Sequence, residues 1–138
     1  MKCDAQRLNA IYDRTGGYCH ICHKKLAFQS YAAFGRRGAW EIEHSVPRVL
    51  GGTDRLCNLY PACIRCNRQK QHVSTRTARH WNGQTRAPRS AERRRQLKSE
   101  NTWAGAELGF LLGAPFGGVG AILGPIVGGY LGRAAKAD

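Results

Sequence analysis

Acidic residues are scarce in this chain of 138 residues, in which nine Asp and Glu stand against 22 Lys and Arg and leave a net charge of +13. The excess lies in residues 1–101, with 20 basic and seven acidic residues, because residues 102–138 contain two of each. A surplus of this size attracts polyanions, both through the overall field and through release of counterions from phosphates. The charge therefore favours a nucleic-acid partner, with a solvated basic surface or an acidic lipid surface as alternatives.

Features of an exported, disulfide-bonded protein are also missing. The polar residues 1–13 lack the apolar stretch and cleavage site of a secretory signal. Four of the six cysteines form two Cys-x-x-Cys pairs, and Cys3 and Cys57 have no obvious partners, which argues against a disulfide scaffold. Paired cysteines in a reducing compartment more often bind metal than form disulfides. We therefore expect a cytoplasmic protein with a metal site.

The two cysteine pairs form a complete ligand set for one tetrahedral zinc ion. Its members are Cys19, Cys22, Cys63 and Cys66. A zinc ion bound there would tie the regions on either side of the sequence Trp40-Glu41-Ile42-Glu43-His44 into one compact unit. Asn58 and Asn67 follow that histidine at intervals of 14 and nine residues.

This constellation resembles the HNH endonuclease family, whose ββα-metal fold carries an acid-His pair on a β-hairpin, an Asn in the next loop and a His or Asn on the closing helix. The resemblance covers residues 15–72 and implies an α+β fold, a small ββα-metal domain stabilised by the four-cysteine zinc site. It implies that His44 is the general base, a role that suits imidazole because its pKa lies near neutral. It also implies that Asn58 orients His44 and that Asn67 belongs to the catalytic set.

The resemblance further implies a catalytic divalent cation, Mg²⁺ or Mn²⁺. We expect its ligands to be the carboxylate of Glu43 and the amide oxygen of Asn67, since hard cations prefer oxygen. Many members of the family have His at the third motif position, so Asn67 makes this chain an HNN-type variant. Successive strand residues point to opposite faces, so Glu43 and His44 can share one site only if the hairpin bends or bulges there.

The expected activity is hydrolysis of phosphodiester bonds in double-stranded DNA with low sequence specificity, because little in the chain suggests base reading. Three basic residues near the second cysteine pair, Arg65, Arg68 and Lys70, would hold phosphates near the cut. A zinc-stabilised nucleic-acid-binding module without catalysis is the first alternative, in which the acid-His pair is incidental. The second alternative is a membrane-active toxin or defence effector whose C-terminal tail is the principal functional element.

Local patterns predict the elements that carry these residues. Residues 4–15 have the apolar spacing of a short helix with an aspartate N-cap. Residues 40–49 alternate as an extended strand, and Gly51-Gly52-Thr53-Asp54 predicts a turn. A helix is expected from Ala62 to Gln71, with Pro61 near its first turn.

The C-terminal tail, residues 102–138, holds ten of the 17 glycines and a run of 25 uncharged residues between Glu107 and Arg133. Many of the glycines recur every four residues and so share one helix face, where small residues allow close approach, as in membrane helices. Two such sets occur: Gly105, Gly109, Gly113 and Gly117, and then Gly120, Gly124, Gly128 and Gly132.

This tail resembles glycine-zipper segments and predicts a glycine-rich helical hairpin. We expect it to contact the inner face of a membrane or to self-associate, with a soluble hairpin as the alternative. The predicted organisation is therefore a nuclease domain at residues 1–72, a basic linker or extension at residues 73–101, and a hydrophobic tail at residues 102–138.

Overall fold

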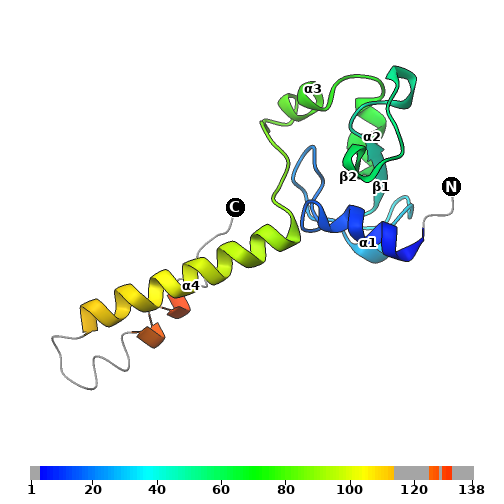
Figure 1. Ribbon diagram of the computed structural model, residues 1–138. Coiled ribbons are helices and arrows are strands. Elements are labelled where there is room, and N and C mark those ends of the chain that lie inside the picture. Colours follow the sequence, from blue (N-terminus) through cyan, green and yellow to red (C-terminus); the bar gives the residue numbers. More distant parts are fainter. Residues whose placement is uncertain (1–3, 114–124, 128, 132–138) are drawn as a thin grey trace. The chain divides into compact units, whose positions relative to one another are not determined.

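Figure 1 shows the computed structural model, which describes residues 4–113, 125–127 and 129–131. The chain divides into two units, Met1–Ala91 and Glu92–Asp138. The first contains the helices α1 (Ala5–Asp13), α2 (Ile64–Lys70) and α3 (Thr75–His80) and the strands β1 (Trp40–His44) and β2 (Leu59–Cys63). Three short 3-10 turns lie in the connecting segments, Phe28–Ser30, Arg48–Leu50 and Leu56–Asn58. This small mixed unit has the predicted α+β character.

Helix α1 begins where the sequence predicts. The Asp4 side chain caps the helix by accepting a hydrogen bond from the backbone N–H of Gln6 at 3.2 Å. The helix turns its apolar face inward, with Ile11 fully buried and Tyr12 packed against the core. Gly17 follows with a φ of +77°, and a Cβ atom there would collide with the Tyr12 ring. Glycine therefore lets the chain pass close to that ring on its way to the first cysteine pair.

Strands β1 and β2 pair antiparallel in unbroken register, from Trp40 opposite Cys63 to His44 opposite Leu59. Trp40 is fully buried at the centre of the core, and the rings of Tyr12, Phe28 and Tyr31 pack around it. This ladder contains no bulge that would bring Glu43 and His44 to the same face. The expectation that these two side chains share one site is therefore wrong. The two side chains alternate instead, with Glu43 buried and His44 partly exposed.

Strand β2 occupies part of the segment for which the sequence predicts a helix. Pro61 lies in β2 opposite Ile42, and α2 begins only at Ile64. The Pro61 carbonyl accepts a hydrogen bond from the N–H of His20 at 3.0 Å, so its backbone polar group faces away from β1. Both strands of a two-stranded sheet are edges, where a residue without an N–H is tolerated. Proline is therefore no obstacle to the strand here.

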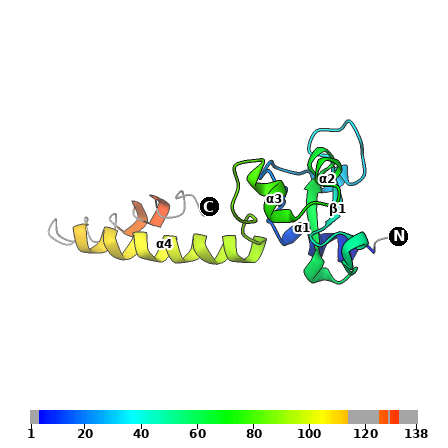
Figure 2. The same ribbon diagram turned by 90° about the horizontal axis from the view of Figure 1, so that it is seen from above.

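Helix α2 packs against both strands, and α3 packs against α2 (Figure 2). Ser74 caps α3 by accepting a hydrogen bond from the N–H of Thr77 at 3.1 Å, and Ala78 is buried. Helix α3 therefore belongs to the folded first unit, although the boundary expected from the sequence lies at residue 72.

Helix α4 (Ala91–Gly113) makes up most of the described second unit. It runs without a break from the basic segment into the glycine-rich tail, so the expected boundary at residue 101 lies within one helix. The rest of the predicted hairpin lies largely outside the described residues, since residues 114–124, 128 and 132–138 are not described. Among the described helices, none combines the length and apolarity that crossing a membrane requires.

Candidate functional site

The four paired cysteines converge on one point. Their Sγ atoms all lie within 4.8 Å of one another, and the Sγ atoms of Cys22 and Cys63 are 3.8 Å apart. Four thiolates around a zinc ion, with Zn–S distances of about 2.3 Å, form a tetrahedron whose sulfur atoms are about 3.8 Å apart. The cluster therefore has the size and donor set of a structural zinc site, and it can hold a metal such as zinc.

Backbone structure brings the two pairs together. The first pair lies in the turn after α1, where the N–H of His23 donates to the carbonyl of Cys19 at 3.0 Å. The second pair straddles a junction, because Cys63 ends β2 and caps α2 while Cys66 lies in the first turn of that helix. Hydrogen bonding among the four thiols lowers the pKa of Cys22 and Cys63 and raises the pKa of Cys19 and Cys66. The four thiols therefore share their protons, and a bound metal would require all four as thiolates.

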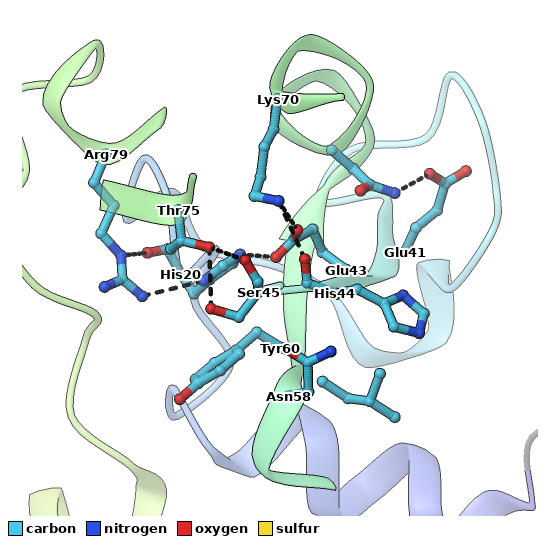
Figure 3. A network of polar contacts seen from close by, with 12 residues as sticks. His20, Glu41, Glu43, His44, Ser45, Asn58, Tyr60, Lys70, Thr75 and Arg79 are labelled. Atoms are coloured by element: carbon cyan, nitrogen blue, oxygen red, sulfur yellow. Dashed lines mark hydrogen bonds and ion pairs between the residues drawn. The ribbon is translucent and has the colours of Figure 1, made fainter. Parts of the chain in front are cut away.

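Glu43 lies in a buried cluster with two basic side chains (Figure 3). Its Oε2 atom is 2.7 Å from Nε2 of His20, and its Oε1 atom is 2.7 Å from Nζ of Lys70. The exposed fractions of Glu43, His20 and Lys70 are 2%, 0% and 1%. The contact with His20 has ion-pair distance without the alignment of a linear hydrogen bond. Lys70 also donates to the backbone carbonyl of His44 at 3.1 Å.

The titration of this cluster follows from its burial and contacts. Burial opposes the charged form of Glu43, but the contacts with His20 and Lys70 outweigh it, so the pKa of Glu43 is lowered. Burial lowers the pKa of His20. Nδ1 of His20 lies 3.2 Å from a guanidinium nitrogen of Arg79, so Nδ1 is the acceptor and the Nε2 proton faces Glu43. Glu43 is therefore held as a carboxylate inside the fold.

The same cluster links the cysteine loop to the strands and to α3. The His20 ring stacks on Tyr60 of β2, with ring centroids 4.9 Å apart and an interplanar angle of 14°. Arg79 of α3 donates to the His20 carbonyl at 2.9 Å, and the Arg14 guanidinium lies 3.9 Å from the centre of the Tyr60 ring. In the patterns of the sequence, His20 stands out only as a neighbour of Cys19. Its contacts give it a supporting role beneath β1.

His44 points in the opposite direction, away from Glu43 and toward solvent, with 20% of its side chain exposed (Figure 3). Its Nε2 atom is 2.7 Å from Oδ1 of Asp54. Arg48 donates from Nη2 to both carboxylate oxygens of Asp54, at 2.6 and 2.7 Å, and its Nε atom is 3.3 Å from Nε2 of His44. Hydrogen bonding to His44, followed by that to Arg48, lowers the pKa of Asp54.

Asp54 and Arg48 are site residues that the sequence patterns did not identify. Asp54 was predicted only as part of a glycine-rich turn, and Arg48 only as one charge of a basic chain. The signal that could have found them is their position, because both lie in the short segment that leaves β1 at His44 and returns to β2.

Asn58 is nearly buried and holds this segment together. Its Oδ1 atom accepts from the N–H of Val46 at 2.7 Å, and its Nδ2 atom donates to the carbonyls of Val46 at 3.0 Å and Thr53 at 2.9 Å. The Asn58 amide therefore joins the start and the end of the segment that follows His44. Among the described contacts of the His44 ring, the partners are Asp54 and Arg48 rather than Asn58.

Asn67 lies on the face of α2 that packs on β1, and its contact differs from the expected one. Its Nδ2 atom donates to Oε2 of Glu41 at 2.9 Å. Glu43 and Asn67 are therefore not poised as a ready-made pair of cation ligands, because each oxygen of Glu43 faces a basic side chain. The adjacent oxygen donors are those of Asn67 and Glu41.

The three basic residues assigned to phosphate binding separate into two groups. Arg65 and Arg68 of α2 are exposed, and Arg68 lies over the Phe34 ring at 4.8 Å and 3.9 Å from a carboxylate oxygen of Glu41. Lys70 is 1% exposed, and its ammonium group pairs with Glu43 and donates a hydrogen bond to the His44 carbonyl. The assignment of Lys70 to phosphate binding is therefore wrong, since no phosphate can reach that ammonium group.

Comparison with protein families agrees with this geometry. The model of the HNH endonuclease family matches residues 19–72, from the first clustered cysteine to just beyond the end of α2. No curated protein matches the chain. The family indicates a nuclease or nucleic-acid-binding role, and HNH nucleases use divalent metals. Residues 19–72 are thus similar to an HNH endonuclease domain, and they contain all four cysteines of the cluster.

Proposed function

We propose that this protein is a metal-dependent endonuclease that hydrolyses phosphodiester bonds of double-stranded DNA with low sequence specificity. The observation that carries the proposal is the environment of His44. Its imidazole lies at the end of β1, partly exposed and in contact with the Asp54 carboxylate, within a strongly basic region that matches a nuclease family. An imidazole in such a place is suited to proton transfer near neutral pH.

Hydrolysis requires a proton acceptor for the attacking water. In the proposed reaction His44 takes a proton from that water, and the water oxygen forms a bond to phosphorus. The bond from phosphorus to the 3′ oxygen breaks, and the departing oxygen takes a proton from solvent. A divalent cation, Mg²⁺ or Mn²⁺, would supply Lewis acidity at the phosphate if it were bound. Glu43 would have to release His20 or Lys70 before it could serve as a ligand for that cation. The Glu43 and Asn67 pair therefore does not fit the cation as it stands, and we assign no step to it.

DNA binding in this proposal rests on the surface charges. Arg65 and Arg68 are exposed on α2, and Arg48 is exposed beside His44. Contacts of arginine with phosphates position a protein on the duplex without reading its sequence. The absence of any element with an evident role in reading bases, among the described residues, is the reason for the proposed low specificity.

Cleavage of supercoiled plasmid tests the proposal. The zinc-loaded protein with Mg²⁺ or Mn²⁺ should nick or linearise the plasmid, and His44→Ala should abolish this while the zinc content per chain stays unchanged. His72→Ala is the matched control, since His72 is an exposed histidine just beyond α2, and this variant should cut like the original protein. Cutting that survives His44→Ala would eliminate His44 as the base.

The enclosure of Glu43 favours a second candidate, a zinc-stabilised module that binds nucleic acid without cutting it. In that case the buried carboxylate serves the fold alone, and no catalytic cation is bound. The two candidates predict different results with the same plasmid. A complex that dissociates with rising salt and leaves the DNA intact with Mg²⁺ and with Mn²⁺ would select the binding module.

A further inference from the structure

The carboxylate of Asp54 approaches the His44 ring from a separate part of the chain. The two residues are ten positions apart, and their side chains meet at 2.7 Å between Oδ1 of Asp54 and Nε2 of His44. The second oxygen of Asp54 is bound by Arg48, whose guanidinium contacts both oxygens. Both contacts come from the same nitrogen, Nη2, and they hold the carboxylate close to the guanidinium group. Asp54 is thereby aimed at a single nitrogen of the ring.

The backbone between His44 and Asp54 has features that set this placement. A Cβ atom on Gly52 would lie 1.8 Å from the carbonyl oxygen of Val46, so the close crossing of the two chain segments requires glycine. Gly51 has a φ of +81°, in the left-handed region that favours glycine. The amide of Asn58 then joins Val46 to Thr53, the residue before Asp54. The close crossing at Gly52 and the contacts of Asn58 thus place Asp54 beside the His44 ring.

The contacts of the ring select one neutral tautomer. Nε2 of His44 faces both the Asp54 carboxylate and Nε of Arg48, and it cannot donate to the first and accept from the second at the same time. The carboxylate is the closer partner, at 2.7 Å against 3.3 Å, and a carboxylate can only accept. Nε2 therefore carries the proton, and the lone pair of the neutral ring is on Nδ1.

We propose that Asp54 is the positioning residue of the active site. It holds His44 in the Nε2–H tautomer and fixes the direction of the ring, so that Nδ1 is the atom that takes the proton from water. Arg48 acts on the ring indirectly, because it holds the Asp54 carboxylate in place. Asn58 acts through the same loop, because its amide sets the position of Asp54. This inference rests on the proposed nuclease function for its catalytic consequence but not for its structural content.

The matched variants are Asp54→Ala, Asp54→Asn and Asp13→Asn, the last of which changes an exposed carboxylate on α1. Because Asp54 and Arg48 are partly exposed, their contact contributes little to stability, so all three variants should fold and keep their zinc. Nicking rates at varied plasmid concentration should show that Asp54→Ala lowers kcat by about 10- to 100-fold with KM unchanged, a part of the 10²- to 10⁴-fold that a base contributes. The kcat of Asp54→Asn should lie between those of Asp54→Ala and the original protein, and the kcat of Asp13→Asn should match that of the original protein.

A spectroscopic measurement separates this inference from the nuclease proposal. The ¹⁵N NMR spectrum of protein labelled in its histidine rings, zinc-loaded and free of other metals, is recorded at a pH where the His44 ring is neutral, with His44→Ala identifying its signals. The original protein should show a protonated Nε2 and an unprotonated Nδ1, and Asp54→Ala should show a mixture of tautomers. If both spectra are as expected but the original protein does not cut DNA, the nuclease proposal fails and the positioning role stands. A mixture in the original protein, or cutting by Asp54→Ala at the full rate, overturns the positioning role.

Discussion

The buried pair of Lys70 and Glu43 gives the most demanding test of the fold. Replacing Lys70 by Met keeps much of the side-chain volume but removes the ammonium group that lies 2.7 Å from Glu43. The remaining partner of the carboxylate is His20, whose pKa is lowered by burial and which is therefore a weak source of positive charge. Glu43 must then stay charged without compensation or take up a proton. Removing one partner of a buried ion pair costs roughly 3–5 kcal/mol.

The cost can be bounded in a second way. If Glu43 becomes neutral by taking up a proton, each unit by which its pKa rises toward the working pH lowers the free energy of unfolding by about 1.4 kcal/mol. A rise from below its usual value to neutral pH therefore gives a loss of the same order. For a domain of 60–100 residues, a loss of 1 kcal/mol lowers Tm by about 4–8 °C. Lys70→Met should thus lower the Tm of the first unit by at least about 12 °C, taking the lower bounds of both ranges.

Thermal and urea unfolding at a fixed concentration of free zinc measures this loss, because a ligand of the folded state shifts its apparent stability. The matched control is Arg68→Met on the same helix, where an exposed arginine lies 3.9 Å from Glu41 and contributes at most about 1 kcal/mol. Adding Glu43→Gln to Lys70→Met removes the charge that was left unpaired and should restore part of the lost stability. If Lys70→Met costs no more than Arg68→Met, or if the second change restores nothing, Glu43 is not held by a buried pair.

Three further outcomes follow from the same geometry. Removing the metal with a chelator, or replacing Cys66 by Ser, should release about one zinc ion per chain and unfold the first unit, as measured by metal content and circular dichroism. Gly52→Ala should destabilise the unit more than Gly51→Ala in urea unfolding, because only the first introduces a Cβ atom at 1.8 Å from a backbone oxygen. The pKa of Glu43 is lowered in the folded state, so its stabilising effect is present above its unfolded pKa and is lost as the pH falls through its folded pKa. The difference in unfolding free energy between the original protein and Glu43→Gln should therefore shrink below about pH 4.5, the usual range of a glutamate pKa.

Spacing along the sequence was sufficient to predict the four-cysteine cluster. Two Cys-x-x-Cys pairs leave few arrangements other than one four-sulfur cluster, since each pair must close a tight turn. The extended segment at β1 was also predictable, because Trp40 and the residues that alternate with it have strand character. The capped α1 followed from its apolar spacing and from Asp4. These features depend on neighbours within a few residues.

Features that depend on tertiary contacts were not predictable in this way. Pro61 suggested the start of a helix, but it lies in an edge strand whose outward carbonyl is bound by His20. Helix α3 was missed because the polar segment after α2 has no strong apolar period, and its burial rests on Ala78 alone among its apolar residues. The role of Asp54 depends on a loop crossing set by Gly52, which no local pattern displays.

The alternation of side chains along β1 decides which carboxylate can contact the His44 ring. Side chains alternate along β1, so once His44 faces solvent, Glu43 must face the interior. Two residues of a strand advance by about 6.6 Å and three residues of a helix by about 4.5 Å. Side chains can span the remaining difference, so two acids on β1 can contact two residues that are three positions apart on α2. Glu41 meets Asn67 and Glu43 meets Lys70 in this way.

Moving Asn67 from Glu41 to Glu43 would therefore mean displacing Lys70 from a buried carboxylate. Glu43, the acid next to His44 in the sequence, is held in the interior by its contact with Lys70. The carboxylate that can act on the ring has to come from elsewhere, and the loop that carries Asp54 supplies it.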